Sequence, residues 1–494
     1  MVAGHPSSCS AGQPVTMVSD GDVDPWDFLA ARKSEVSARE PAVSEAIAQE
    51  PILPRERGEI RAEMAGPTLK RRAWPLAAAL IAVSFAGFLT EVVGASQMIA
   101  LAGPSSLIYM YPLGGLGLIA VALLQFRFVD HRARLPMLRA VGFGYAAVFI
   151  VAIVFISLSV WEVAATGAIW LLADQLNFLV PLLVWSLAGD EFNVAEGRKI
   201  FGWIVAWTYL GQLAGLAVSA FAPLAMDPLG IPLWALLALD PIVCVFVALW
   251  LPRRLRHTAA AKGTAKDENL RESLAGAWEF INGVKVWRTL LIASLITFAS
   301  TMTAHLAFLS GVGTILGSDA SALQVLIGSV TFGVFILCWL IQKLAARRVQ
   351  DRLGIPGTLL ILPIAVVLAG LVLAVGSAMG SIAVLVVGIA LVRIPRWTVD
   401  ENTRRAALAL VPDERRARVS FFVDLGPIAL GLIIAGPIGL IGVVFGVAWV
   451  VPLIAAVIAA FAIRPSISVI RGWDDSLMNW RLRRRKQNRT LDFS

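Results

Sequence analysis

Long apolar stretches separated by short polar loops fill the sequence from Trp74 to Ile463. A helix of about 20 apolar residues crosses the roughly 30 Å hydrocarbon core of a bilayer, and a helix satisfies all its backbone hydrogen bonds internally. The pattern therefore predicts an all-α polytopic membrane protein with twelve transmembrane helices. They cover residues 74–96, 105–128, 137–160, 164–188, 199–222, 231–251, 289–312, 323–345, 357–377, 380–397, 419–440 and 443–463.

The composition excludes several classes of protein. Hydrophobic residues make up 58% of the chain and charged residues only 15%, which is outside the range of soluble domains. The four His and three Cys residues form no CxxC, HExxH or other clustered pattern, so we expect no metal ion and no cofactor. Without a glycine-rich phosphate loop or a paired catalytic motif, neither an ATP-driven pump nor an enzyme is expected.

The basic residues show a strong asymmetry along the chain. Lys and Arg lie in the N-terminal tail, in or beside alternate loops and after the last span, whereas loops such as 97–104 and 223–230 have none. Because basic loops stay on the cytoplasmic side, we expect both termini in the cytoplasm. The same asymmetry explains the net charge of +8 without any nucleic-acid partner. No organelle transit peptide is recognisable, so a bacterial inner membrane is the expected location.

A polar segment divides the spans into six and six. We expect a disordered cytoplasmic tail at 1–72, a six-helix half at 73–251, a cytoplasmic linker with an amphipathic helix at 252–288, a second half at 289–464 and a basic tail at 465–494. This plan resembles the major facilitator superfamily, in which a central cavity opens alternately to each side.

Two loops support this resemblance. Residues 350–354 read QDRLG and match the D-R-x-G loop of facilitators, and the equivalent loop 126–134 keeps Asp130 and Arg134 but has Phe126 in place of Gly. An Asp that caps a helix end and pairs with Arg can hold one conformation, although a solvated charged turn is the alternative. We also expect Arg393 and Asp424 to pair with each other. The predicted conformational latch is therefore Asp130, Arg134, Asp351, Arg352 and Asp424.

Two further regions resemble the nucleotide transporter family, the ATP/ADP antiporters of plastids and intracellular bacteria, and their bacterial relatives. They are 185–202, where an aromatic span end leads into an acidic turn and a basic helix start, and 396–418, with its RWTVDENTR and VPDERRAR sequences. The resemblance implies exchange of nucleotides. The chain departs from the family at Glu91, where the family has a basic residue, and an acid there would repel a triphosphate.

A charged residue in the middle of a span costs about 2.5–3.5 kcal/mol on membrane-insertion scales. Each ionisable residue inside a span is therefore expected to have a function or a structural partner. Glu91 and His305 occupy equivalent positions in the first and seventh spans, and both can change charge. Polar residues also share one face of the fourth and fifth spans. For all of them, hydrogen bonding to a neighbouring helix is the alternative reading. The candidates for substrate binding or proton coupling are Glu91, Asp174, Asn177, Gln212, His305 and Arg393.

These features predict a secondary transporter that moves a small organic solute by alternating access. A nucleotide or another organic anion is one candidate solute, and a metabolite, a siderophore or a lipid-like molecule is equally compatible with the sequence. The alternative is a non-transporting facilitator-like protein that acts as an assembly factor or partner in a membrane complex. The basic run 481–486 is expected to bind anionic lipids of the inner leaflet.

Overall fold

The computed structural model describes residues 66–129, 134–192, 194–255, 270–408, 411 and 418–491. These residues are helical apart from short turns and contain no strand. The chain divides into a unit at 1–67 and a compact unit at 68–494. Among the described residues of the second unit, twelve helical segments are long and apolar enough to cross a membrane, which confirms the predicted number of spans.

Six of these spans come from the first half of the chain. The helices are α3 (Gly66–Ala102), α4 (Leu107–Val129), α5 (Arg134–Ser157), α6 (Glu162–Glu191), α7 (Val194–Met226) and α8 (Leu239–Arg254), with short 3-10 turns at Pro104–Ser106, Asp227–Leu229 and Leu233–Ala238.

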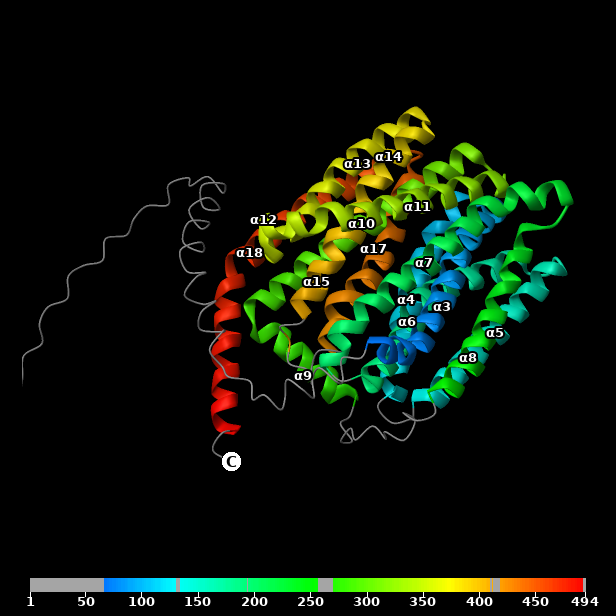
Figure 1. The fold of residues 1–494 in the computed structure, drawn as a ribbon. Helices are drawn as coiled ribbons and strands as arrows, with labels where there is room; N and C mark the ends of the chain where they lie inside the picture. The colour runs from blue at the N-terminus through cyan, green and yellow to red at the C-terminus, as the bar shows by residue number, and fades with distance from the viewer. Residues whose placement is uncertain are drawn as a thin grey trace, which may run out of the picture. The chain divides into compact units, whose positions relative to one another are not determined.

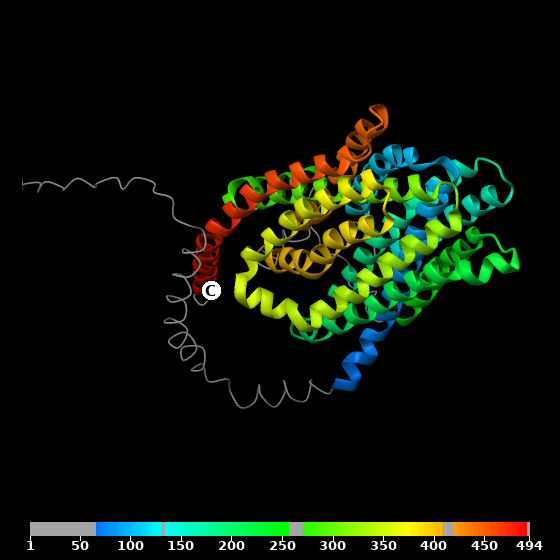
Figure 2. The same ribbon diagram turned by 90° about the horizontal axis from the view of Figure 1, so that it is seen from above.

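The second half begins with α9, which lies within the predicted linker. The helices are α9 (Leu270–Gly283), α10 (Lys285–Leu316), α11 (Ala320–Ile341), α12 (Arg347–Gly357), α13 (Ile361–Met379), α14 (Ile382–Pro395), α15 (Glu401–Leu408), α17 (Gly426–Val444) and α18 (Val450–Leu491). Wider π-helical turns cover Gln342–Ala346, Arg396–Asp400 and Phe421–Leu425, and a 3-10 turn covers Thr358–Leu360. Figures 1 and 2 show α10–α18 beside α3–α8, with α18 along the edge of its half.

Some spans differ in extent from those expected. The twelfth span covers Val450–Asp474 instead of 443–463, because the chain turns at 445–449, where Gly446 has a φ of 65°. This turn is made of apolar residues, so hydropathy does not mark it. The tenth span continues through a π-helical turn to Leu408, well beyond the expected end at residue 397. The tail 1–65 lies outside the described residues.

Successive spans run in opposite directions and define two faces. The basic face is the one where α3 begins and α8 ends, and it carries Arg72 and Arg254. The opposite face carries the turns at Trp161 and Gly230. The twelve spans place both ends of the helical unit on the basic face.

Glycines allow the helices to approach closely. On α7, a Cβ at Gly211 or Gly215 would collide with the backbone of α3 at Ile81 or Phe85, so only Gly fits these positions. Glycines also allow the two halves to approach closely near the opposite face, where α3 meets α10, α4 meets α17 and α7 meets α11. The close approaches there are Ile99 to Gly313, Ile108 to Gly436 and Ala220 to Gly328.

Replacing Gly211 by Ala should destabilise the protein, because the new methyl group meets backbone atoms of α3 that cannot rotate away. Overpacking of this kind costs about 1–3 kcal/mol. Gly202→Ala on the same helix is the matched control, since nothing lies within 4 Å of its added Cβ. Thermal unfolding of the purified protein in detergent should show a lower Tm for Gly211→Ala only. Equal Tm values for the two variants would contradict the proposed packing.

Candidate functional site

Polar side chains from six helices meet near the middle of the spans, three helices coming from each half. We call this group the central cluster. Its members are Glu91 of α3, Tyr111 of α4, Asp174 and Asn177 of α6, His305 of α10, Thr331 of α11 and Arg393 of α14.

Arg393 connects the two halves. Its Nη2 lies 2.7 Å from Nε2 of His305 and 3.9 Å from Oε1 of Glu91, and its Nη1 donates a hydrogen bond to Thr331 Oγ1. The Arg393 side chain is only 11% exposed. The guanidinium is therefore held mainly by neutral acceptors of its own half, with the Glu91 carboxylate of the other half at the edge of contact.

The contacts of His305 fix its protonation. A guanidinium can only donate, so Nε2 of His305 accepts from Arg393 and carries no proton. The imidazole is then neutral, with its proton on Nδ1, which lies 3.0 Å from the Tyr111 hydroxyl. His305 thus donates to Tyr111 Oη across the interface between halves, and the Tyr111 proton is free to point elsewhere. A second proton on the ring would remove the acceptor that holds Arg393.

Glu91 is held from its own half. Asn177 Nδ2 donates to Glu91 Oε2 at 3.2 Å, and Gly87 on α3 makes room for Asn177, because a Cβ there would collide with Asn177 Oδ1. Asn177 Oδ1 is buried without a hydrogen-bond partner. Asp174 lies one turn away beside α4, where a Cβ at Gly114 would be 3.0 Å from its Oδ2.

Gln212 is separate from this network. Its Oε1 is buried without a partner, and among the described residues no hydrogen bond joins it to the central cluster. The structure therefore brings five of the six predicted candidates together. Tyr111 and Thr331 complete the cluster and were missed, because a neutral Tyr or Thr within an apolar span gives no distinctive sequence signal.

A layer of aromatic rings lies one turn from the central cluster, toward the basic face. Phe335 of α11 contacts Phe88 of α3, Tyr209 of α7 and Trp397 after α14, with centroid distances of 5.1, 5.7 and 5.5 Å. Because these rings come from both halves, they form an apolar contact across the interface.

Closer to the basic face, Arg404 is the centre of a second charged group, the Arg404 cluster. Its guanidinium contacts Asp400 Oδ2 at 2.9 Å, Glu401 Oε2 at 3.0 Å and Asp424 Oδ1 at 3.2 Å, and only 2% of the side chain is exposed. Its Cζ also lies 4.5 Å from the centre of the Phe298 ring. Three carboxylates and an aromatic face thus stabilise one buried cation.

The expected pair between Arg393 and Asp424 is wrong. Arg393 contacts His305, Thr331 and Glu91, whereas Asp424 contacts Arg404 and Ser420. The reason is the π-helical turn Arg396–Asp400, which carries the tenth span on to Leu408 and brings Arg404 beside Asp424. The four-residue spacing of Asp400 and Arg404 is the sequence signal that could have revealed this cluster.

The remaining latch residues lie elsewhere. Asp351 and Arg352 are exposed on α12, which bends at Gly354, where φ is 69°. Asp130 lies outside the described residues, and only the backbone of Arg134 is described. Their role as a latch stays a prediction. The described part of the chain also holds no group of three or more His, Cys, Asp or Glu side chains suited to a metal ion.

Removing Arg404 should strongly destabilise the protein, because Arg404→Leu removes the buried cation that Asp400, Glu401 and Asp424 share and leaves Glu401 with Arg405 alone. Breaking a buried ion pair from one side costs about 3–5 kcal/mol. Arg405→Leu is the matched control: Arg405 also pairs with Glu401, at 2.8 Å, but its side chain is 60% exposed, and exposed pairs contribute about 0–1 kcal/mol. Thermal unfolding in detergent should separate the two variants, and similar Tm values would contradict a structural role for the cluster.

Comparison with solved structures places this geometry in a known fold. The nucleoside transporter NupG superposes with a TM-score of 0.61 at 17% identity, covering 80% of this chain and 99% of that one. A POT family transporter, solved in complex with a thioalcohol-conjugated peptide, gives 0.58 at 11% identity, covering 81% of this chain and 96% of that one. An inward-facing bacterial homologue of the iron transporter ferroportin gives 0.58 at 14% identity, covering 80% of this chain and 98% of that one.

The sequence itself gives no such match. No protein-family model matches it, and no curated protein matches it. At these identities the structural likeness concerns the fold. The chain is thus an all-α, twelve-span protein with the major-facilitator-like fold of these transporters.

Proposed function

We propose that this protein is a secondary active transporter that moves a small organic solute by alternating access, with the central cluster as its solute or coupling site. One observation carries the proposal: ionisable and polar side chains of the two halves contact each other near the middle of the spans. Glu91 contacts Arg393, and Tyr111 contacts His305. Groups that serve stability alone can pair within one half, as the Arg404 cluster does.

The contacts between halves favour a state closed at the opposite face. At that face the glycines let the backbones of helices from the two halves approach each other closely, as Gly328 and Ala220 do. Toward the basic face, by contrast, solvent reaches the side chains of Glu401 and Asp424, which are 28% and 31% exposed. In our proposal the halves rock about the central cluster, so that closing the basic face opens the opposite one. The Arg393 contacts with Glu91 lie at the interface that this motion rearranges.

The charges suggest an anionic solute. The contact between Arg393 and Glu91 is long, at 3.9 Å. A carboxylate or phosphate of the solute that comes within hydrogen-bond distance can therefore compete with Glu91 for the guanidinium. A nucleotide fits this chemistry and the resemblance of residues 185–202 and 396–418 to nucleotide antiporters. Glu91 and Asp174 oppose a highly charged solute, so a monoanion is the better candidate.

The test is uptake of labelled ATP, ADP and a panel of organic anions into proteoliposomes, with and without a pH gradient. Glu91→Gln and Arg393→Gln should each lower flux by about 10- to 100-fold, the effect of losing a charged hydrogen bond of about 1.5–3 kcal/mol. Glu162→Gln, at the opposite-face end of α6, removes a carboxylate outside the cluster and should transport normally. Unchanged flux in both cluster variants would refute the site while sparing the fold.

Absence of flux for every solute would count against transport itself. Purification with a partner in fixed stoichiometry would then favour the alternative, a facilitator-like assembly factor.

A disulfide across the opposite face should stop the transport cycle. In a variant without natural cysteines, Ala220→Cys and Gly328→Cys place two Cβ atoms about 3.0 Å apart, slightly closer than a disulfide needs, so the helices must separate by a few tenths of an ångström. Oxidation should abolish flux and reduction should restore it. Each single cysteine variant is the control, and full flux in the oxidised double variant would contradict opening at this face.

A further inference from the structure

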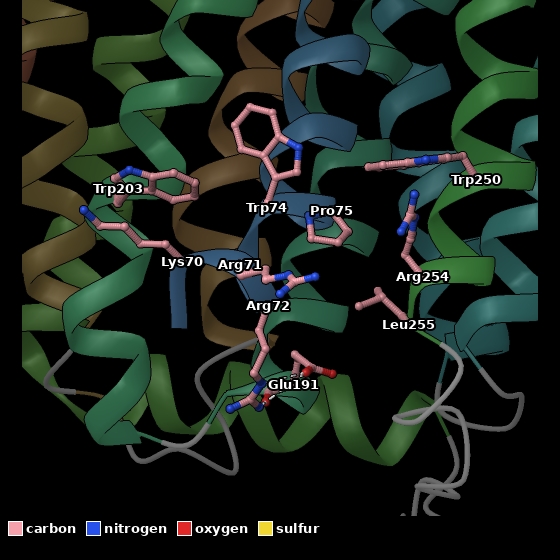
Figure 3. Close-up of a pocket in the computed structure, with 10 residues that line it drawn as sticks. All are labelled: Lys70, Arg71, Arg72, Trp74, Pro75, Glu191, Trp203, Trp250, Arg254 and Leu255. Carbon is pink, nitrogen blue, oxygen red and sulfur yellow. Dashed lines mark hydrogen bonds and ion pairs between the residues drawn. The ribbon is translucent and has the colours of Figure 1, made fainter. Parts of the chain in front are cut away.

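A second cavity lies in the N-terminal half, away from the central cluster. It has a volume of about 780 Å³ and is formed at the basic face by the start of α3, by α7 and by the end of α8. Figure 3 shows its lining side chains. None of them belongs to the central cluster or the Arg404 cluster, so the proposed transport site does not account for this cavity.

The lining of this cavity is strongly cationic. Lys70, Arg71, Arg72 and Arg254 line it together with a single carboxylate, Glu191. Arg72 turns away to Glu191, at 3.3 Å, and to Glu196, at 2.9 Å.

The other three cations have no carboxylate partner among the described residues. Figure 3 shows Arg71 extending from α3 toward the side of the cavity where Arg254 lies. Two guanidinium groups on either side of one hollow repel each other unless an anion lies between them.

Indole rings form the wall of the cavity above these cations in the view of Figure 3. Trp74 packs against Trp203 at a centroid distance of 6.1 Å, and the Arg254 guanidinium lies over the Trp250 ring at 5.9 Å. Trp250 is itself stacked on Phe246 at 5.3 Å. Trp side chains of this kind are typical of the boundary between hydrocarbon and headgroups. The cavity thus combines an apolar aromatic wall with a cationic rim.

We propose that this cavity binds a phosphate group between Arg71 and Arg254. A guanidinium group can donate two parallel hydrogen bonds to two oxygens of one phosphate. Basic pockets between transmembrane helices also bind the phosphate headgroups of lipids. The phosphate can be carried by an anionic phospholipid, whose chains would lie along the Trp wall, or by a water-soluble compound. Both sources share the same chemistry at the two arginines.

The experiment compares two double variants of the full-length protein that carry the same change in net charge. Arg71→Gln with Arg254→Gln removes the two cavity guanidinium groups. Arg253→Gln with Arg348→Gln removes two exposed cations outside the cavity, one of them adjacent to Arg254 in sequence. Native mass spectrometry measures binding of phosphatidylglycerol to each protein, with and without inorganic phosphate as competitor. Equal Tm values establish that both variants are folded.

The cavity variant should bind phosphatidylglycerol about 10- to 30-fold more weakly, because the phosphate loses charge-assisted hydrogen bonds at the cavity. The control should stay within about twofold of the natural protein, because Arg253 and Arg348 do not line the cavity. Competition by inorganic phosphate would show that the two arginines are open to a soluble phosphate, and its absence would show that they bind the headgroup only as part of a lipid. Equal binding by the two double variants, whether both are weakened or neither, would overturn the proposal.

Discussion

Hydrocarbon offers no hydrogen bonds, and this constraint governs the whole molecule. Each span must be a helix, because a helix satisfies its own backbone, and a charged side chain inside a span is stabilised by partners on neighbouring helices. The partners of Arg393 are accordingly His305 and Thr331 of its own half and Glu91 of the other. Glycines allow the helices to come close enough for these short polar contacts. Gly87, for example, leaves room for the side chain of Asn177. Fold and central cluster are thus two results of the same physical requirement.

The fold was predictable because its signal is local. Twelve apolar stretches of membrane-spanning length are visible in the sequence, and the structure has twelve spans. The errors occur where hydropathy carries no information. Gly446 ends a span inside apolar sequence through a positive φ, and the tenth span continues past its apolar stretch to Leu408, since charged residues there are neutralised by one another within the bundle.

The candidate site was predictable residue by residue but not contact by contact. Glu91, His305 and Arg393 stood out because ionisable groups inside spans are costly. Which of them touch depends on how each helix is rotated about its axis, and the sequence does not state that rotation. For this reason Arg393 was assigned the wrong partner, and Arg404, placed in a loop by the sequence, proved to be the cation that binds Asp424.

The wide turns at Arg396–Asp400 and Phe421–Leu425 have a mechanical consequence. A π-helical turn contains one residue more than the α-helical turn it replaces, so a helix can lose or shift this bulge without losing its continuity. Moving it by one residue rotates the side chains on one side of the bulge relative to those on the other. In the tenth span the bulge separates Arg393 from Arg404. The span can therefore twist internally, so that the guanidinium at mid-membrane reorients while the one near the basic face stays anchored to its three carboxylates.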